Sequence, residues 1–205
     1  MPKAFTSQER QKLQRQLMDI GRQLFGRYGY AKTSMDLVCH EARIGKGTLY
    51  SFWPNKESYF FACFEEEQQI FQEEVIAPVF QEPLSLPQAF GEIFKKTHQQ
   101  IQNYPVLHIG MDVILIEQIM RRVSPEVIAH HDEKDKNRLN QLFPNKDFPI
   151  PPELMDGVFK ALLTPAFHQQ FVGEKEFPEV IELLGDLLTA GLQSLSKNKK
   201  ECFHD

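Results

Sequence analysis

The sequence predicts an all-α protein. Apolar residues recur at intervals of three and four along most of the 205 residues, as they do on one face of an α-helix. The sequence shows no run of alternating β-branched residues bounded by turns, which would indicate a strand. Proline and glycine residues divide the helical pattern into about nine segments. We therefore expect helices packed on helices.

The N-terminal quarter contains three helices and the start of a fourth. Gly29 ends the first, because glycine tolerates the left-handed conformation that closes many helices. Pro54 stops the third, and Asn55 caps the fourth. The caps of the first and second helices are Thr6 or Ser7, and Thr33 or Ser34. The expected ranges are residues 7–29, 34–42, 45–52 and 55 to beyond 70.

The remaining sequence predicts longer helices separated by prolines. Residues 106–122 form a strongly apolar segment, residues 125–143 a polar one, and residues 144–152 a proline-rich loop. Pro165 kinks or shortens the helix in which it lies, because proline removes a backbone hydrogen bond. The expected helices are residues 86–103, 106–122, 125–143, 152–171 and 177–195.

The composition is that of an ordinary soluble protein, with 41% hydrophobic and 25% charged residues. The longest nearly apolar stretch, residues 113–116, is far shorter than the roughly 20 residues that span a membrane. The first residues show no apolar core of a signal peptide. Cys39, Cys63 and Cys202 lie far apart, which favours a reducing compartment. We therefore expect a cytoplasmic protein without a membrane partner.

Charge is divided unevenly along the chain. Residues 1–60 hold ten basic and five acidic residues, a net charge of +5, whereas the remainder holds 13 basic and 23 acidic residues, a net charge of −10. A basic segment on an acidic body is expected when one end of a protein meets a polyanion. Chance variation between parts of a chain is the alternative.

Residues 33–53 have the spacing of a helix-turn-helix. Two short helices are joined by a turn of about three residues around positions 43–45. The small side chains of Cys39 and Ala42 let the helices cross closely, and Ile44 and Leu49 fill the angle between them. Gly47, near the start of the second helix, permits close approach of its backbone to another surface.

Two stretches of this region resemble the TetR family of bacterial transcriptional regulators: Gly29-Tyr30-x-x-Thr33-Ser34-Met35, and Ala42-x-Ile44-x-Lys46-Gly47-Thr48-Leu49-Tyr50-x-Phe52-Trp53-x-x-Lys56-Glu57. The resemblance covers residues 10–60. It implies a three-helix DNA-binding domain over residues 1–54. It also implies a ligand-binding and dimerisation domain of about six helices over residues 55–205.

Two residues depart from the family pattern in the turn. Arg43 stands where the family usually has glycine, and Gly45 stands where the family usually has a serine cap. Arg43 in a left-handed conformation would cost roughly 1–2 kcal/mol. The alternative is that Gly45 takes that conformation instead.

The resemblance assigns DNA contacts by position. Thr33 and Ser34 would hold a phosphate at the start of the second helix, and Tyr50 and Lys56 would contact the DNA backbone. The residues facing the major groove would be Lys46, Gly47, Thr48 and Ser51.

An effector pocket is predicted along the apolar helix from residue 106. His108, Met111 and Leu115 share one face of a continuous helix, with Asp112 beside it, and Phe94 is the fifth candidate residue. The alternative is a core helix whose Asp112 reaches water or a cap. A small hydrophobic or amphipathic molecule is the expected ligand.

The last two helices carry wide apolar stripes, and in the resembling family such a pair meets its twin in a homodimer. The predicted interface residues are Met155, Phe159, Leu162, Ile181, Leu184, Leu188 and Leu192. The alternative is that both stripes are buried within one chain.

The predicted function is a DNA-binding regulator, a repressor released from its operator by a ligand. The alternatives are a helix-turn-helix activator or ligand-independent regulator, and an all-α cytoplasmic enzyme. An enzyme is not expected, because the sequence shows no nucleophile with a base nearby. The acidic and histidine cluster at residues 130–133 does not predict a metal site, since adjacent helical residues point about 100° apart. We expect no cofactor.

Overall fold

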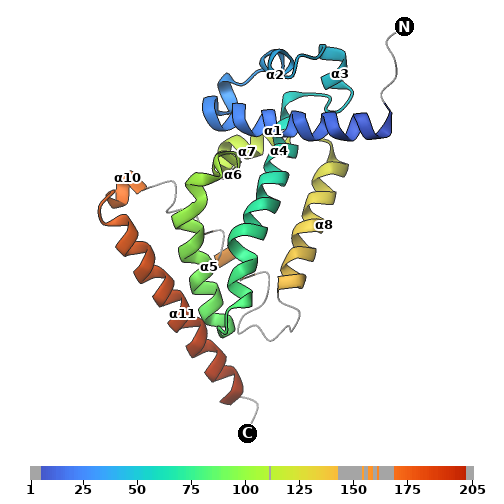
Figure 1. The fold of residues 1–205 in the computed structure, drawn as a ribbon. Helices are drawn as coiled ribbons and strands as arrows, with labels where there is room; N and C mark the ends of the chain where they lie inside the picture. The colour runs from blue at the N-terminus through green and yellow to red at the C-terminus, as the bar shows by residue number, and fades with distance from the viewer. Residues whose placement is uncertain are drawn as a thin grey trace. The chain divides into compact units, whose positions relative to one another are not determined.

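The computed structural model describes residues 6–110, 112–142, 154, 157, 158, 161 and 169–201, and of residues 135–142, 170, 171 and 198–201 only the backbone. The described residues form helices and no strand (Figure 1). The α-helices are α1 (Ser7–Lys32), α2 (Met35–Ala42), α3 (Lys46–Tyr50), α4 (Lys56–Phe71), α5 (Leu86–Gln100), α6 (Pro105–Gly110), α7 (Val113–Met120), α8 (Pro125–Leu142), α10 (Gln169–Val172) and α11 (Phe177–Glu201). A π-helical turn, η1 (Gln72–Ile76), and two 3₁₀ turns, η2 (Ala77–Gln81) and η3 (Ile101–Asn103), complete the elements. The predicted all-α fold is confirmed.

The chain divides into two compact units. The first comprises Met1–Ile70 and Asn103–Lys134, and the second comprises Phe71–Gln102 and Asp135–Asp205. These two units are regions of dense packing and do not coincide with the predicted functional domains. The functional boundary between residues 54 and 55 stays a prediction.

Helix α1 begins as its sequence predicts, and Gly29 interrupts it where the sequence predicts its end, although the element continues to Lys32. Thr6 is the N-cap, and its hydroxyl accepts a hydrogen bond from the Glu9 backbone N–H at 3.2 Å. The Glu9 carboxylate accepts one in return from the Thr6 backbone N–H at 2.8 Å, which completes a capping box. Gly29 has a φ of +75° and interrupts the helical conformation.

The core of the first unit joins α1 to α4. Phe25 and Phe60 are buried and meet edge to face, with ring centroids 5.0 Å apart. The buried Tyr59 hydroxyl donates a hydrogen bond to the Leu17 carbonyl oxygen. The two helices approach so closely at Gly21 that a β-carbon there would lie 2.5 Å from the Tyr59 hydroxyl oxygen. The surface of α1 that supports the helix-turn-helix is therefore fixed to α4.

Three consecutive glutamates on α4 contact three different helices of the first unit. Glu65 pairs with His131 of α8 at 3.2 Å, and Glu66 pairs with Arg22 of α1 at 3.2 Å. The third, Glu67, is buried and accepts a hydrogen bond from the Leu107 backbone N–H of α6 at 2.6 Å. Successive helical residues point about 100° apart, which is why three neighbours reach three partners.

The predicted single helix over residues 106–122 is wrong. The chain forms two helices there, α6 and α7, and Asp112 is the N-cap of α7. The Asp112 carboxylate accepts hydrogen bonds from the backbone N–H groups of Ile114 and Leu115, both at 3.1 Å. A capping aspartate starts a new helix because its carboxylate satisfies two N–H groups that a continuous helix would pair internally.

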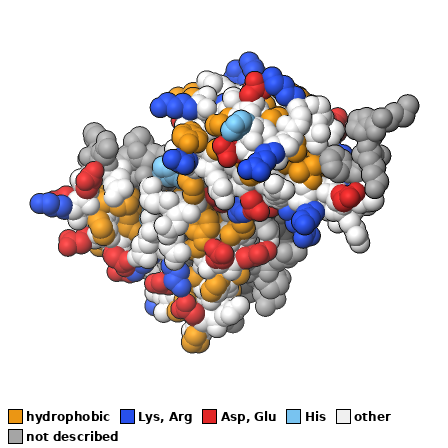
Figure 2. Space-filling view, turned by 45° about the horizontal axis from the view of Figure 1, so that its top comes forward, with side chains coloured by type: hydrophobic (Ala, Val, Ile, Leu, Met, Phe, Trp, Pro, Cys, Tyr) orange, Lys and Arg blue, Asp and Glu red, His pale blue; other side chains and the backbone are white. Residues whose placement is uncertain are grey.

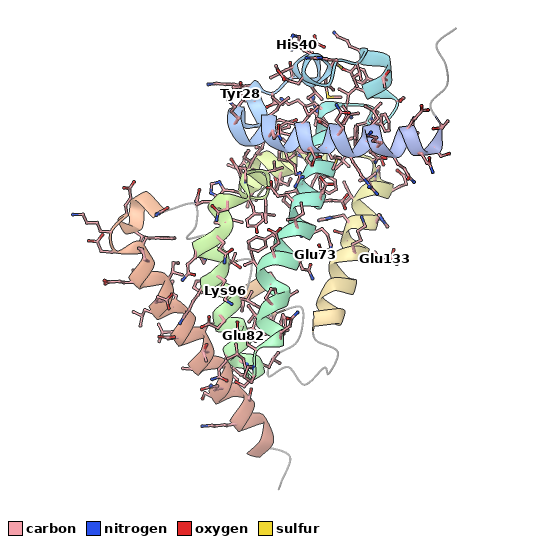
Figure 3. The ribbon with its side chains drawn as sticks, in the orientation of Figure 1. Tyr28, His40, Glu73, Glu82, Lys96 and Glu133 are labelled. Atoms are coloured by element: carbon pink, nitrogen blue, oxygen red, sulfur yellow. The ribbon has the colours of Figure 1, made fainter. Side chains whose placement is uncertain are left out.

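In the second unit, α5 and α11 lie side by side (Figure 1). Phe94 of α5 packs with Phe177 and Ile181 of α11 in a buried apolar cluster. Across the same contact, Lys95 Nζ lies 3.0 Å from Glu182 and 2.8 Å from Asp186. On another side of α5, Lys96 pairs with Glu82 at 3.0 Å, and both side chains are labelled in Figure 3.

Candidate nucleic-acid interface

The turn between α2 and α3 is closed by Arg43 in a left-handed conformation. Arg43 has φ 54° and ψ 44°, and its backbone N–H bonds to the carbonyl oxygens of Cys39 and His40. Gly45 has an ordinary φ of −76° and is the N-cap of α3. The chain therefore keeps the left-handed position at the usual site, with an arginine instead of glycine.

Helix α3 presents one exposed face. Leu49 is fully buried beneath it, whereas Tyr50 is 45% exposed and Lys46 and Gly47 are exposed. A β-carbon at Gly47 would meet no atom within 4 Å, so the backbone is open at that point. Figure 2 shows Lys and Arg side chains spread over the outer surface of the N-terminal helices. This face can approach a flat or grooved anionic surface.

Lys46 is paired with an acidic residue of the neighbouring helix. Its Nζ lies 2.7 Å from Asp36 Oδ1 in the first turn of α2, and this hydrogen bond raises the pKa of Lys46. Both side chains are more than 60% exposed, at 63% and 65%. Solvent-exposed pairs contribute little to folding stability, so the ammonium can exchange this partner for another anion.

Of the two hydroxyls predicted at the start of α2, only that of Ser34 lies at the surface. Ser34 is the N-cap, and its Oγ accepts a hydrogen bond from the Leu37 backbone N–H at 3.1 Å. Thr33 is buried, and its hydroxyl lies 3.1 Å from the Leu24 carbonyl oxygen and 2.9 Å from that of Gly29. A phosphate contact from Thr33 would therefore come from its backbone.

Ser51 is also engaged within the protein. Its hydroxyl donates to the Thr48 carbonyl oxygen at 2.7 Å. Its own carbonyl oxygen accepts a hydrogen bond from the Arg10 guanidinium at 2.9 Å, and the same guanidinium lies 4.1 Å from the centre of the Phe52 ring. Sequence reasoning missed Arg10, because a contact over 41 residues leaves no local pattern.

Lys56 stands at the start of α4 with its ammonium over an aromatic ring. Its Nζ lies 4.1 Å from the centre of the Tyr30 ring and 3.5 Å from the Ala31 carbonyl oxygen. Burial lowers the pKa of Lys56. The Tyr30 ring packs against Phe25 and Phe60, and burial and the Glu57 carboxylate raise the pKa of its phenol to about 12. The cation is therefore held in place near α1 and α4.

The predicted effector residues fall in both units. Phe94 lies in the core of the second unit, whereas His108, Asp112 and Leu115 belong to the first. Burial lowers the pKa of His108, Asp112 caps α7, and Leu115 packs against the first unit's core. His108 and Leu115 lie on two separate helices, so the predicted shared face of one continuous helix is wrong. Met111 lies outside the described residues.

The predicted dimer residues on α11 face inward to different degrees. Ile181 and Leu192 are buried, and Leu184 and Leu188 are half-buried and pack against the Phe94 cluster. The exposed apolar residues of α11 are Leu183, Leu187 and Leu195. Met155, Phe159 and Leu162 lie outside the described residues.

The histidines near residue 130 do not gather around a common point. His131 is buried against the rings of Phe61 and Phe64 and pairs with Glu65. Among the residues that the structure describes, no group of three or more His, Cys, Asp or Glu side chains could hold a metal ion. Over the same residues, no helix combines the length and apolar character that crossing a bilayer requires.

Comparison with known proteins supports the helix-turn-helix reading. Residues 17–63 match the family described as "Bacterial regulatory proteins, tetR family". YhgD of Bacillus subtilis strain 168, an HTH-type transcriptional regulator, is 26% identical over 123 residues, which cover 58% of this chain. The match spans 64% of the length of YhgD.

Two solved structures share the fold. A TetR-family regulator from Pectobacterium atrosepticum aligns with a TM-score of 0.60 at 20% identity, covering 93% of this chain and 95% of that one. A second, from Marinobacter aquaeolei VT8, aligns with a TM-score of 0.56 at 15% identity, covering 90% and 97%. Residues 17–63, which contain the helix-turn-helix, thus match the family of bacterial TetR regulators, and the all-α fold is similar to that of two solved TetR-family structures.

Proposed function

We propose that this protein is a homodimeric repressor, which binds double-stranded operator DNA and leaves it when a small hydrophobic or amphipathic effector binds. The exposed face of α3, with Lys46 and Tyr50 beside the capped start of α2, carries the proposal. In a helix-turn-helix the second helix lies in the major groove. The protein acts in the cytoplasm, needs no cofactor and catalyses no reaction.

The proposed DNA contacts are of two kinds: contacts to phosphates, which position the protein, and contacts to bases, which recognise the sequence. Ser34 and Tyr50 are exposed and Lys56 is half-buried, and these residues of different elements would hold phosphates on either side of the groove. Lys46 would reach a guanine and Thr48 a thymine methyl. Thr33 and Ser51 contribute through their backbone, because their hydroxyls are bonded within the protein.

The homodimer would form through the exposed apolar side of α11. Leu183, Leu187 and Leu195 are between 45% and 60% exposed, which is costly for large apolar side chains grouped on one helix. A two-fold partner would cover them and place two α3 helices about 34–36 Å apart, one turn of DNA. The half-buried Leu184 and Leu188 would lie at the edge of that interface.

Release follows from differential affinity. The effector would bind better to a conformation in which the two DNA-binding domains, residues 1–54 of each copy, are too far apart for the operator. It would then weaken DNA binding, and DNA would weaken effector binding by the same factor. The coupling expected for such a system is about 1–3 kcal/mol.

The test is binding to the DNA immediately upstream of the protein's own gene, measured by fluorescence anisotropy over a series of salt concentrations. We expect that DNA to bind more tightly than random DNA of the same length, with affinity falling as salt rises. In a reporter strain, removing the protein should raise expression from the same DNA. Equal affinity for both DNAs would exclude a specific regulator, and lowered expression would indicate an activator.

A further inference from the structure

A cavity of about 430 Å³ lies within the second unit, at the end of α5 and the start of α11. None of the predicted effector residues that the structure describes lines this cavity. Phe94 lies next to it, because its ring packs against the ring of His98, a lining residue, with ring centroids 4.6 Å apart. Its volume falls within the roughly 300–1,000 Å³ of small-molecule sites. Its described lining includes the buried His98, Ile101, Phe177 and Ile181 and the exposed Glu179 and Glu182.

The floor of the cavity is apolar and aromatic. Ile101, Phe177 and Ile181 are all buried, and each contributes to the lining. The ring of His98 is also buried and meets Phe177 at 6.1 Å between centroids. A ligand that covers this floor gains by removing apolar surface from water.

The rim is polar and acidic. Glu182 is held in place, since its Oε1 accepts a hydrogen bond from Gln99 Nε2 at 2.9 Å and its Oε2 lies 3.0 Å from Lys95 Nζ. Glu179 lies three residues before Glu182, on the same side of α11, and is exposed. Among the lining residues that the structure describes, none is a lysine or an arginine. Lys95 offsets the charge of Glu182, so an anionic ligand at the described rim would meet the exposed carboxylate of Glu179.

We propose that this cavity binds a small organic cation that carries an aromatic or branched apolar group. The apolar group lies on Phe177 and Ile181, and the cationic centre lies at the rim beside Glu179. The Phe177 ring adds a favourable interaction with the positive charge. The glutamine amides at the rim supply hydrogen-bond partners for an ammonium or its bound water.

We further infer that the cation is the effector of the proposed function, and this inference rests on that function. Glu179 and Glu182 lie on the same helix as Leu183 and Leu187, the residues through which two copies would meet. A cation seated at the rim acts on the first turns of that helix. A bound cation could therefore change how two copies pack, and with that the distance between their two DNA-binding domains.

The experiment is isothermal titration calorimetry of the full-length protein with benzyltrimethylammonium. Benzyl alcohol serves as the neutral probe and benzenesulfonate as the anionic one. We expect saturable binding of the cation, weaker binding of the alcohol and none of the sulfonate. Glu179→Gln should weaken cation binding about fivefold, because one carboxylate near the charge is removed, and should leave alcohol binding unchanged.

Glu174→Gln is the matched control, since Glu174 is an exposed acid just before α11 that does not line the cavity. It should bind the cation as the unmodified protein does. Absence of cation binding, equal binding of the sulfonate, or equal weakening in both variants would overturn the proposal. Operator affinity measured without any probe separates this from the proposed function, since the protein can fail either measurement and pass the other.

Discussion

Lys46 Nζ of α3 lies 2.7 Å from Asp36 Oδ1 of α2, so the cation best placed to reach DNA is already held by an anion. A phosphate or a guanine must compete with this carboxylate for the ammonium. Asp36 would therefore lower affinity for every DNA sequence and favour those sequences that give Lys46 a better partner. Under the proposed function, this ion pair would affect which DNA sequences the protein prefers.

Asp36→Asn should tighten DNA binding about threefold to tenfold at low salt, because a competing negative charge is removed from the interface. Fluorescence anisotropy with operator and random DNA measures the change, and random DNA should gain more. Glu41→Gln is the control, since it removes another exposed acid of α2 that lies 3.7 Å from His40, the residue labelled at the outer end of α2 in Figure 3. An equal gain in both variants would mean that net charge alone is responsible.

Gly47→Ala should leave the fold intact and weaken operator binding at least tenfold. The added methyl group meets no protein atom within 4 Å, and alanine favours helix over glycine by about 1 kcal/mol. The loss is expected because the backbone of α3 would no longer approach the DNA surface closely. Thermal unfolding and anisotropy are measured on the same samples. Unchanged operator affinity would show that Gly47 does not face the DNA.

Arg43→Gly should stabilise the protein by roughly 0.5–1 kcal/mol, since glycine adopts the left-handed conformation of this turn without strain. Urea unfolding measures the difference. Arg43→Ala is the matched control, because it removes the guanidinium but keeps a β-carbon at φ 54°. Equal stability of the two variants would show that the side chain, and not the backbone conformation, sets the cost.

Leu187→Asp should yield monomers that keep their helical content and lose operator binding. Leu187 is 59% exposed on α11, so a carboxylate there disturbs only a contact with a second copy. Leu188→Asp should instead destabilise the fold by about 2–3 kcal/mol, because Leu188 packs against the Phe94 cluster. Analytical ultracentrifugation and circular dichroism distinguish these effects.

Val127→Asp is the control for the dimer prediction, since Val127 is a similarly exposed apolar residue on α8. It should sediment as the unmodified protein does. If Leu187→Asp also remains a dimer that binds operator DNA, the two copies meet through another surface.

Glu67→Gln should be at least as stable as the unmodified protein at pH 7. Burial raises the pKa of Glu67 above its usual 4.5, although the backbone N–H groups of Val106 and Leu107 oppose that shift. A raised pKa means that the folded state binds the proton more tightly, so stability falls as pH rises through the range above 4.5. The glutamine amide keeps an acceptor for the Leu107 N–H and removes this dependence.

Glu67→Ala supplies the contrast, since it leaves the buried Leu107 N–H without its acceptor and should cost about 1–3 kcal/mol. Urea unfolding between pH 4.5 and pH 7 measures all three proteins. A pH profile of Glu67→Gln that parallels the unmodified protein would show that Glu67 does not cause the slope.

The helix-turn-helix could be predicted from the sequence because its determinants are local. Thr6, Ser34 and Asn55 cap helices within three residues of themselves, and Gly29 interrupts α1 by its own conformation. The interruption at Asp112 follows the same capping rule. It was missed because apolar residues on both sides of Asp112 continue the helical period.

The contacts of the candidate site were harder to predict, because one side chain can serve two roles. A hydroxyl such as that of Thr33 can bond a phosphate or a carbonyl oxygen of its own chain, and only the fold decides between them. The apolar stripe of α11 is wide enough to supply both a core and an exposed surface. The sequence does not distinguish Leu188, which packs inward, from Leu187, which does not.

The three glutamates of α4 have a mechanical consequence. Turning α4 about its own axis would lengthen the contacts of Glu65, Glu66 and Glu67 with α8, α1 and α6 simultaneously. Sliding it along that axis would do the same. Either movement would strain three contacts together, so we expect α4 to move with the helices that these contacts join to it.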